Sequence, residues 1–212
     1  MRFKLLMQSL YKQIDQIQSL KLEPRFRHAA HAALYARTDA KQFGKYPKYA
    51  HLLVQLRFDG TFGFTGGIVD EGETPLIAVN RESSEELGIP SDSLNITQED
   101  YVITHYADEL NLCLHFYAKE IKFDKIVEIE SKCVKGKDYG NEVLGLIRVP
   151  LYTLPNGLGL PAFLGSQFIG SSRMNLLLLL KERNILPENE LRKAIELSKS
   201  IKTVVSADDI NI

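Results

Sequence analysis

The chain has 212 residues, 44% of them hydrophobic and 25% charged, and its formal net charge is −1. A chain of this length can bury the core of one domain, and its composition is that of an ordinary soluble globular protein. The near-neutral total gives no sign of a protein that binds polyanions through its overall charge.

The charges are unevenly distributed along the chain. The first 57 residues contain eleven Lys or Arg and three Asp or Glu, so this part carries +8 and the remainder −9. A basic segment beside an acidic one fits a phosphate ligand held by cations and a metal ion held by carboxylates. Surface charges scattered by chance are the second interpretation.

Three features bear on the compartment. The two cysteines, Cys113 and Cys133, form no C-x-x-C motif, which favours a reducing compartment over a disulfide framework. The first twenty residues are interrupted by polar residues and lack the apolar run of a signal peptide, so we expect no secretion. The apolar run at 176–180 is too short to span a bilayer, and no membrane partner is expected.

The N-terminal part predicts a helix and then two strands. Leu6, Leu10, Ile14 and Ile17 recur at helical spacing, so residues 1–25 are expected to form an amphipathic helical extension. Residues 27–37 and 49–58 have the composition of strands, and the second alternates between two distinct faces. Four glycines between positions 60 and 67 then indicate turns.

The next element is a helix with well-marked ends. Thr74 suits the N-cap, and Pro75 suits the first helical position because no amide hydrogen is needed there. Gly88 is a natural stop after Leu87. The sequence therefore predicts a helix that opens at Thr74 and runs to about Leu87.

The second half predicts three further strands and three helices. We expect strands at 101–107, 112–119 and 142–149, a short helix at 124–131, and helices at 171–183 and 187–200 within a C-terminal helical part, 171–201. Strands and helices alternate without a strict βαβ rhythm, so we expect an α/β fold with a mixed sheet and helices on both faces. No shift in composition marks a boundary, and residues 1–212 are expected to form a single domain.

Three carboxylates share one face of the helix that Thr74 opens. Glu82, Glu85 and Glu86 stand at positions i, i+3 and i+4. Hard oxygen ligands on one rigid face suit Mg²⁺ or Mn²⁺. We expect Glu73 and Arg81 to form an ion pair that ties the preceding loop to this helix. A merely solvated acidic face is the alternative.

The spacing of these residues carries a resemblance. Gly67, Glu73, Arg81-Glu82, Glu85-Glu86 and Gly88-Ile89 stand at the positions of the Nudix box, G-x5-E-x7-R-E-U-x-E-E-x-G-U, where U is aliphatic. Every fixed position matches, and Ser83 alone departs, at an aliphatic position. The chain thus resembles Nudix hydrolases, which implies an α/β/α sandwich containing the Nudix loop-helix motif and metal-dependent hydrolysis of a nucleoside diphosphate linked to another group.

The likeness extends to one branch of that family. RHAAHAALYA, RFDGTFGFTGG, HFYAKE, KDYGNEVLGLIRVPLYTL and PAFLGSQFIGS are similar to the branch that decaps small nucleolar RNA and hydrolyses inosine and deoxyinosine diphosphate. A sister protein there is an inactive scaffold without the box glutamates. All of them are present in this chain, which favours the active enzyme.

The resemblance implies the metal and catalytic residues. Metals would be held by the backbone of Gly66 and by Glu82, Glu86 and His105, with Glu85 in the same cluster. Glu142, in the KDYGNE stretch, is a candidate base or further ligand. A surface position on a strand is the second interpretation of His105.

The resemblance also implies the substrate contacts, which are His31, Arg57, Phe64 and Asn175. Each has an alternative: His31 as a hydrogen-bonded core histidine, Arg57 in a pair with Asp59, and Phe64 as core. The position of Phe64 between glycines favours an exposed ring that stacks on a base. The side chain of Asn175 is shorter than the amide usual at its position.

Three functions follow as expectations. One is hydrolysis of deaminated purine diphosphates and another is removal of the 5′ cap from RNA, with Lys41, Lys45, Lys48, Tyr46 and Tyr49 following the strand. The third is a scaffold that binds RNA or protein without turnover. The branch further implies a homodimer in the nucleolus and nucleoplasm, with the cytoplasm as a further location.

Overall fold

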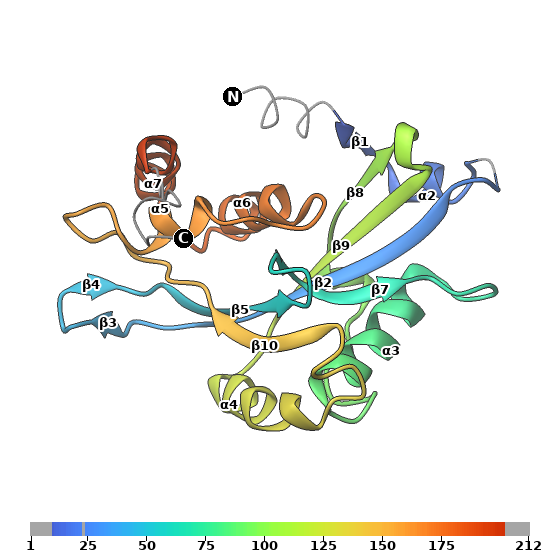
Figure 1. Ribbon diagram of the computed structural model, residues 1–212, viewed down its shortest axis with the longest axis horizontal. Helices are drawn as coiled ribbons and strands as arrows, with labels where there is room; N and C mark the ends of the chain where they lie inside the picture. Colours follow the sequence, from blue (N-terminus) through green and yellow to red (C-terminus); the bar gives the residue numbers. More distant parts are fainter. Residues whose placement is uncertain (1–9, 23, 202–212) are drawn as a thin grey trace, which may run out of the picture.

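An eight-stranded mixed sheet forms the centre of the protein (Figure 1). The computed structural model describes residues 10–22 and 24–201. The strands follow the order β1-β8-β9-β2-β5-β10, while β6 pairs with β5 and β7 with β2. Their bounds are β1 Lys12–Ile14, β2 Arg27–Arg37, β5 Ala50–Arg57, β6 Phe62–Gly63, β7 Thr65–Ile68, β8 Tyr101–Ala107, β9 Leu112–Glu120 and β10 Val143–Arg148. Strands β2 and β9 run parallel and the other pairs antiparallel, so the predicted mixed sheet is confirmed.

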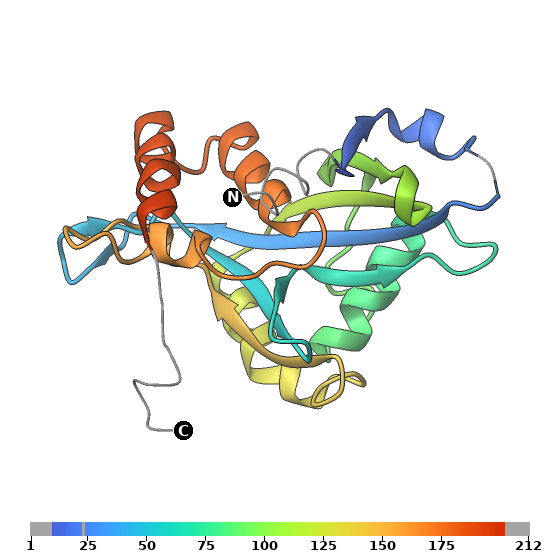
Figure 2. The same cartoon turned by 45° about the horizontal axis from the view of Figure 1, so that its top comes forward.

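Helices cover both faces of this sheet, as predicted. One face carries α3 (Pro75–Leu87) and α4 (Phe123–Lys132), and the other carries α5 (Leu160–Leu164), α6 (Ser172–Glu182) and α7 (Glu188–Ser200) (Figure 2). The remaining elements are the short helix α2 (Gln16–Ser19) and a two-stranded hairpin of β3 (Lys41–Gln42) and β4 (Tyr46–Pro47). No helix among residues 10–22 and 24–201 is long and apolar enough to cross a membrane.

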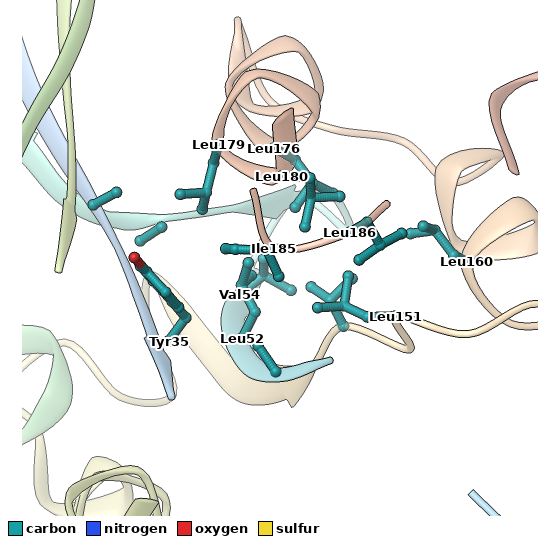
Figure 3. Close-up of a cluster of buried hydrophobic side chains, with 14 of the residues drawn as sticks. Tyr35, Leu52, Val54, Leu151, Leu160, Leu176, Leu179, Leu180, Ile185 and Leu186 are labelled. Carbon is teal, nitrogen blue, oxygen red and sulfur yellow. The ribbon is translucent and has the colours of Figure 1, made fainter. Parts of the chain in front are cut away.

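Strand β2 separates two hydrophobic cores. Ala30, Ala32 and Leu34 belong to the core under α3 and α4, whereas Ala33 and Tyr35 belong to the core under the C-terminal helices. This alternation follows from the two-residue period of a strand. Figure 3 shows the second core, in which leucines of α6 pack toward Tyr35 and the apolar residues of β5.

The sheet forks beside β2. Residues 29–32 of β2 pair with β7, whereas residues 34–37 pair with β5. Beyond Leu53, β5 leaves β2 and pairs with β6 and β10 instead. The two arms of this fork, β7 and the distal half of β5, therefore leave an opening in the sheet at the level of Ala33.

Helix α3 begins and ends where the sequence predicts. The Thr74 hydroxyl accepts the Ile77 amide at 3.2 Å, and Pro75 occupies the first turn. Gly88 has a φ of +63°, and a Cβ there would lie 2.5 Å from the carbonyl oxygen of Lys132. Only glycine fits this stop, because both the backbone conformation and the space exclude a side chain.

The N-terminal prediction is wrong within the described residues. Residues 12–14 form β1 on the edge of β8 instead of continuing a helix, and among the described residues before β2 only Leu10 and the four residues of α2 are helical. The open edge of β8 supplies backbone partners that a short helix would have to supply for itself. Leu6 lies outside the described residues, and Ile17 is exposed.

The other predicted elements are confirmed within one or two residues. The four short strands β3, β4, β6 and β7 were not predicted. They lie in turn-rich segments, and three of them, β4, β6 and β7, contain glycine or proline, which obscures the period of a strand.

Ser83 tests how well α3 packs on the sheet. Its side chain is fully buried and its hydroxyl finds no partner within the described chain, while the neighbouring Ser84 hydroxyl donates to the Ile89 carbonyl at 2.6 Å. We expect Ser83→Ala to stabilise the fold and Ser84→Ala not to, with a difference of about 1–2 kcal/mol in the free energy of unfolding. Both variants gain the same helix propensity, so urea denaturation isolates the hydrogen bond. Equal effects in the two variants would contradict this account.

A buried polar chain crosses β8, β9 and β2 and makes stability sensitive to acid. Tyr101 donates to Thr104, whose hydroxyl meets His115 at 3.0 Å, and His115 meets His28 at 2.9 Å. Burial, and then the nearby His28 and His31, lower the pKa of His115 to about 3. Unfolded histidine titrates near pH 6.5.

The unfolded chain therefore binds more protons than the folded one between these two pKa values, and stability should fall as pH decreases through that window. His115→Gln cannot take up the proton, so its free energy of unfolding should depend less on pH between about 6.5 and 4. Denaturant titrations across that range measure both slopes. Parallel slopes for the two proteins would rule out His115 as a source of the acid sensitivity.

Candidate active site

Glu86 lies in the opening of the fork. Its side chain is 3% exposed, and one carboxylate oxygen accepts hydrogen bonds from Gln55 at 2.9 Å, Thr65 at 2.6 Å and the Gly66 amide at 2.8 Å. Gln55 belongs to one arm of the fork, and Thr65 and Gly66 belong to the other. The carboxylate thus joins the two arms, and its other oxygen accepts no hydrogen bond from residues 10–22 or 24–201.

Burial dominates the electrostatics of Glu86. It raises the pKa of this carboxyl to about 7, although the three donors oppose the shift and nearby Glu82 adds to it. A cation beside the free oxygen would favour the ionised form, because metal ligands bind deprotonated.

Glu82 lies against the glycine pair of β7. A Cβ on Gly67 would stand 2.7–2.8 Å from the Glu82 carboxyl group, and a Cβ on Gly66 would stand 2.1 Å from the carbonyl oxygen of Ala30. Gly66, with a φ of +131° against backbone atoms, therefore tolerates no side chain, whereas a side chain at position 67 would displace the Glu82 carboxylate. Burial raises the pKa of Glu82, and Glu85 and Asp138 add to the rise while Arg81 opposes it.

Arg81 holds the acidic loop against α3. Its guanidinium donates to both oxygens of Glu73, at 2.8 and 2.9 Å, and to Glu82 at 2.7 Å. A fourth hydrogen bond, at 3.2 Å, reaches the carbonyl of Ile68 at the end of β7. The expected Glu73–Arg81 pair is formed, in the bidentate geometry that fixes a carboxylate most firmly.

The two remaining acidic candidates are more exposed. Glu85 pairs with Lys137 at 3.1 Å, in the loop that follows α4. Glu142 is exposed, and only its backbone is engaged, by Asp138 at 3.0 Å and Phe58 at 3.1 Å. The structure therefore brings Glu82, Glu85 and Glu86 together on α3 and leaves Glu142 on the neighbouring turn.

The donor set fits a hard divalent cation. Glu82, Glu85 and Glu86 each keep one carboxylate oxygen that accepts no hydrogen bond in the described part, and oxygen donors are what Mg²⁺ and Mn²⁺ prefer. Among the described residues, no three His, Cys, Asp or Glu side chains lie close enough together to hold a metal ion as they stand. Arg81 and Lys137 now neutralise the carboxylates that an ion would gather.

The substrate candidates lie around the other side of the opening. His31 is partly exposed, and burial, followed by the nearby Arg57 guanidinium, lowers its pKa to about 4. The alternative of a hydrogen-bonded core histidine is wrong, because His31 makes no hydrogen bond within the described chain. The stem of Arg57 passes over Gly63, where a Cβ would lie 3.1 Å from its Cδ.

Three of the predicted residues carry a buried polar atom without a partner among the described residues: Nε of Arg57, Nδ1 of His105 and Oδ1 of Asn175. The alternative pair of Arg57 with Asp59 is formed as an ion pair at 3.6 Å, a separation too long for a hydrogen bond. Asn175 uses only its amide nitrogen, which donates to Ser171 at 3.2 Å. Such orphans are rare in native proteins, and a bound ligand is one way to satisfy them.

His105 is buried rather than a surface strand residue. It is 3% exposed on β8, and burial lowers its pKa to about 4. Its cross-strand partner Leu114 belongs to a core with Met174 of α6, which places His105 on the face opposite α3. A role as metal ligand beside the glutamates stays a prediction.

The exposed ring predicted for Phe64 is wrong. Phe64 is 3% exposed and packs against Phe116 with ring centroids 4.9 Å apart, inside the core under α6. Its backbone links β6, which pairs with β5, to β7, which pairs with β2. The alternative of a core residue is therefore the correct one.

Comparison with known proteins identifies the family. Residues 28–186 match the family model described as "Nudt16-like: U8 snoRNA-decapping enzyme-like", which covers three quarters of the chain. The chain belongs to this family. It is a Nudix hydrolase, a pyrophosphohydrolase by family, and Nudix hydrolases generally use divalent metals.

Two relatives and one structure place the protein further. It is 41% identical over 194 residues to the "U8 snoRNA-decapping enzyme" of Xenopus laevis, covering 90% of this chain and 91% of the relative. It is 36% identical over 187 residues to the "Tudor-interacting repair regulator protein" of Homo sapiens, covering 87% of each. A mutT/nudix family protein from Listeria innocua shares the fold, with a TM-score of 0.50 at 17% identity over 74% of this chain and 94% of that one.

Four residues beside the Nudix box were missed in the sequence. Gln55 and Thr65 donate hydrogen bonds to Glu86. Lys137 forms an ion pair with Glu85, and the charge of Asp138 raises the pKa of Glu82. Gln55 carried a signal, since a polar residue at the buried position of a strand needs a partner. Lys137 and Asp138 stand in the KDYGNE stretch, in which the resemblance implied a role for Glu142 alone.

The hydrogen bonds to Glu86 can be tested by removing one donor. Thr65→Val keeps the volume but removes the 2.6 Å donor, so we expect divalent-cation affinity to fall roughly 10- to 100-fold, as for other residues that orient a metal ligand. Isothermal titration with Mn²⁺ measures the affinity. Thr61→Val, which removes a hydroxyl bonded to Asp59 on the nearby turn, is the matched control. Equal affinities in both variants would show that Thr65 does not position Glu86.

Proposed function

We propose that this Nudix hydrolase removes the 5′ cap of RNA and also cleaves purine nucleoside diphosphates of the inosine type to monophosphate and phosphate. The observation that carries the proposal is the complete box with Glu86 seated in the fork of the sheet. The Xenopus laevis relative supports it through its name, U8 snoRNA-decapping enzyme. The unpartnered polar atoms of Arg57 and Asn175 support a nucleotide ligand on the adjoining face.

Each part of the site has a task in this reaction. Glu82, Glu85, Glu86 and the Gly66 carbonyl would hold Mg²⁺ or Mn²⁺, which neutralises pyrophosphate charge and lowers the pKa of a bound water. Gln55, Thr65 and the Gly66 amide hold Glu86 in one orientation. Arg81 holds the loop and α3 together through Glu73.

The remaining residues bind substrate and move a proton. The guanidinium of Arg57 is suited to a phosphate, and the neutral imidazole of His31 and the free oxygen of Asn175 are suited to the polar edge of a purine. A glutamate of the box, or Glu142 on the neighbouring turn, accepts the proton of the attacking water. His105 is a further candidate ligand.

A second candidate function is that of a scaffold without turnover. The relative named "Tudor-interacting repair regulator protein" favours it, since that name describes binding to a partner and its match covers 87% of the chain, against 90% for the decapping relative, at slightly lower identity. The intact glutamates and the tight seat of Glu86 favour catalysis, because a scaffold has no need for a buried carboxylate that burial drives toward its neutral form.

We further propose a homodimer that works in the nucleus, in nucleolus and nucleoplasm, with the cytoplasm as a second place. The support is the resemblance to the snoRNA-decapping branch. Light scattering of the purified protein tests the dimer, and imaging of the tagged full-length chain tests the location.

The proposed activity has a direct test. Glu86→Gln removes the charge of one proposed metal ligand. Because a bound metal stabilises the charge of the transition state by several kcal/mol, hydrolysis of inosine diphosphate and of capped RNA should fall by roughly a hundredfold or more. Glu71→Gln, an exposed acid in the preceding loop, is the control and should retain activity. Chelation of the metal should abolish both reactions in the wild type.

The outcomes separate the functions. Cap release that matches nucleoside diphosphate hydrolysis supports both substrates. Hydrolysis of the diphosphate alone reduces the proposal to nucleotide clearance. Absence of turnover with either substrate contradicts the enzyme and favours the scaffold.

A further inference from the structure

A cavity of about 470 Å³ lies at the far end of the sheet from the Nudix box. Its lining includes Tyr46 and Pro47 of the β3–β4 hairpin, Tyr49 before β5, Tyr152 in the loop after β10, and Lys193 of α7. In Figures 1 and 2 the hairpin and α7 lie together at one end of the molecule, and α3 lies toward the other. The volume is in the usual range for small-ligand sites.

Aromatic rings from three separate segments meet in this cavity. Tyr46, Tyr49 and Tyr152 are all partly exposed, so their rings remain available for contact. Lys45 holds its ammonium 5.5 Å from the centre of the Tyr46 ring. Burial, and then nearby Glu190, raise the pKa of Tyr49, so its hydroxyl stays protonated near neutral pH. Aromatic rings with protonated hydroxyls suit a flat, polar-edged ligand such as a nucleobase.

The surroundings of the cavity are positively charged. Lys41, Lys45 and Lys48 of the hairpin and Lys193 of α7 form no ion pair within the described chain. Elsewhere, cations such as Lys119, Lys125 and Lys132 are paired with carboxylates. Glu190 is the single acidic residue of the lining. Unpaired lysines beside aromatic rings form the combination that binds single-stranded nucleic acid.

The cavity opens on the same side of the sheet as the substrate candidates. His31, Ala33 and Tyr35 alternate along β2 on the face that α6 and α7 cover, and Leu186 and Lys193 reach the cavity from that face. Gly66 pairs with His31, and Ala50, next to Tyr49, pairs with Arg37. His31 and Arg37 are six residues apart on β2, which corresponds to about 20 Å along the strand. This is the length of roughly six stacked nucleotides.

We infer that this tyrosine cavity binds the single-stranded RNA that follows the cap, by stacking a base on Tyr46, Tyr49 or Tyr152 while the hairpin lysines and Lys193 contact phosphates. The inference rests on the proposed decapping function and adds to it a second RNA contact, away from the catalytic glutamates. The prolines in the lining make a proline-rich peptide the rival occupant, but four unpaired lysines are better matched by a polyanion.

Binding of RNA without a cap tests the cavity separately from catalysis. A fluorescent 5′-monophosphate RNA of roughly twelve nucleotides spans both levels, and anisotropy gives its Kd across a salt series. Tyr46→Leu should raise Kd about fivefold or more, whereas Tyr46→Phe keeps the ring and should bind nearly as the wild type. Lys193→Glu should weaken binding and lower the slope of log K against log salt by about one or more.

Lys12→Glu on β1 is the matched control, since Lys12 is exposed, unpaired in the described part and at the opposite edge of the sheet. All variants should hydrolyse inosine diphosphate as the wild type does, which also shows that they fold. RNA binding that is unchanged in Tyr46→Leu and Lys193→Glu overturns the inference, as does an equal loss in Lys12→Glu.

Two further outcomes separate this inference from the proposed function. If the wild type hydrolyses neither substrate yet RNA binding follows the cavity variants, the enzyme proposal fails and the RNA cavity is supported. If a proline-rich peptide binds through Tyr46 and RNA does not compete, the cavity is a peptide site and the inference is wrong.

Discussion

The three hydrogen bonds to one oxygen of Glu86 are the interaction on which the site depends. They join Gln55 on one arm of the forked sheet to Thr65 and Gly66 on the other, so helix α3 and both arms meet at a single buried carboxylate. Burying a carboxylate away from water costs free energy of folding unless hydrogen-bond donors surround it. The fork supplies those donors because the strands that separate there expose polar groups that a continuous sheet would cover.

The fork also connects the two faces of the sheet. Helix α3 lies beneath it with Glu82 and Glu85, while His31 and Asn175 lie on the face that α6 covers. Under the proposed function, a substrate bound among the α6-face residues would reach carboxylates that belong to the other layer. The glycines at 66 and 67 make this possible, because a side chain at either position would fill the narrow space between β2, β7 and Glu82.

Several polar groups of the site remain incomplete in the protein alone. Arg57, His105 and Asn175 each keep a buried atom without a partner in the described residues, and Glu82 and Glu86 are driven toward their neutral forms by burial. These features reduce the stability of the fold, and a cation and a nucleotide would satisfy them. Ser83 is different: its unpaired hydroxyl faces the packed interior behind α3, where no ligand reaches it.

Local sequence was enough to determine most elements and the identity of the box. The ends of α3 follow from Thr74, Pro75 and Gly88, and the long strands follow from their composition, because caps and periodicity act over a few residues. Only the tertiary structure decided what depends on distant partners. The edge of β8 turned residues 12–14 into a strand, packing against Phe116 buried Phe64, and the fork brought Gln55 and Thr65 to Glu86. The tyrosine cavity likewise needs the hairpin, the loop after β10 and α7 to meet, and nothing local in the sequence encodes that meeting.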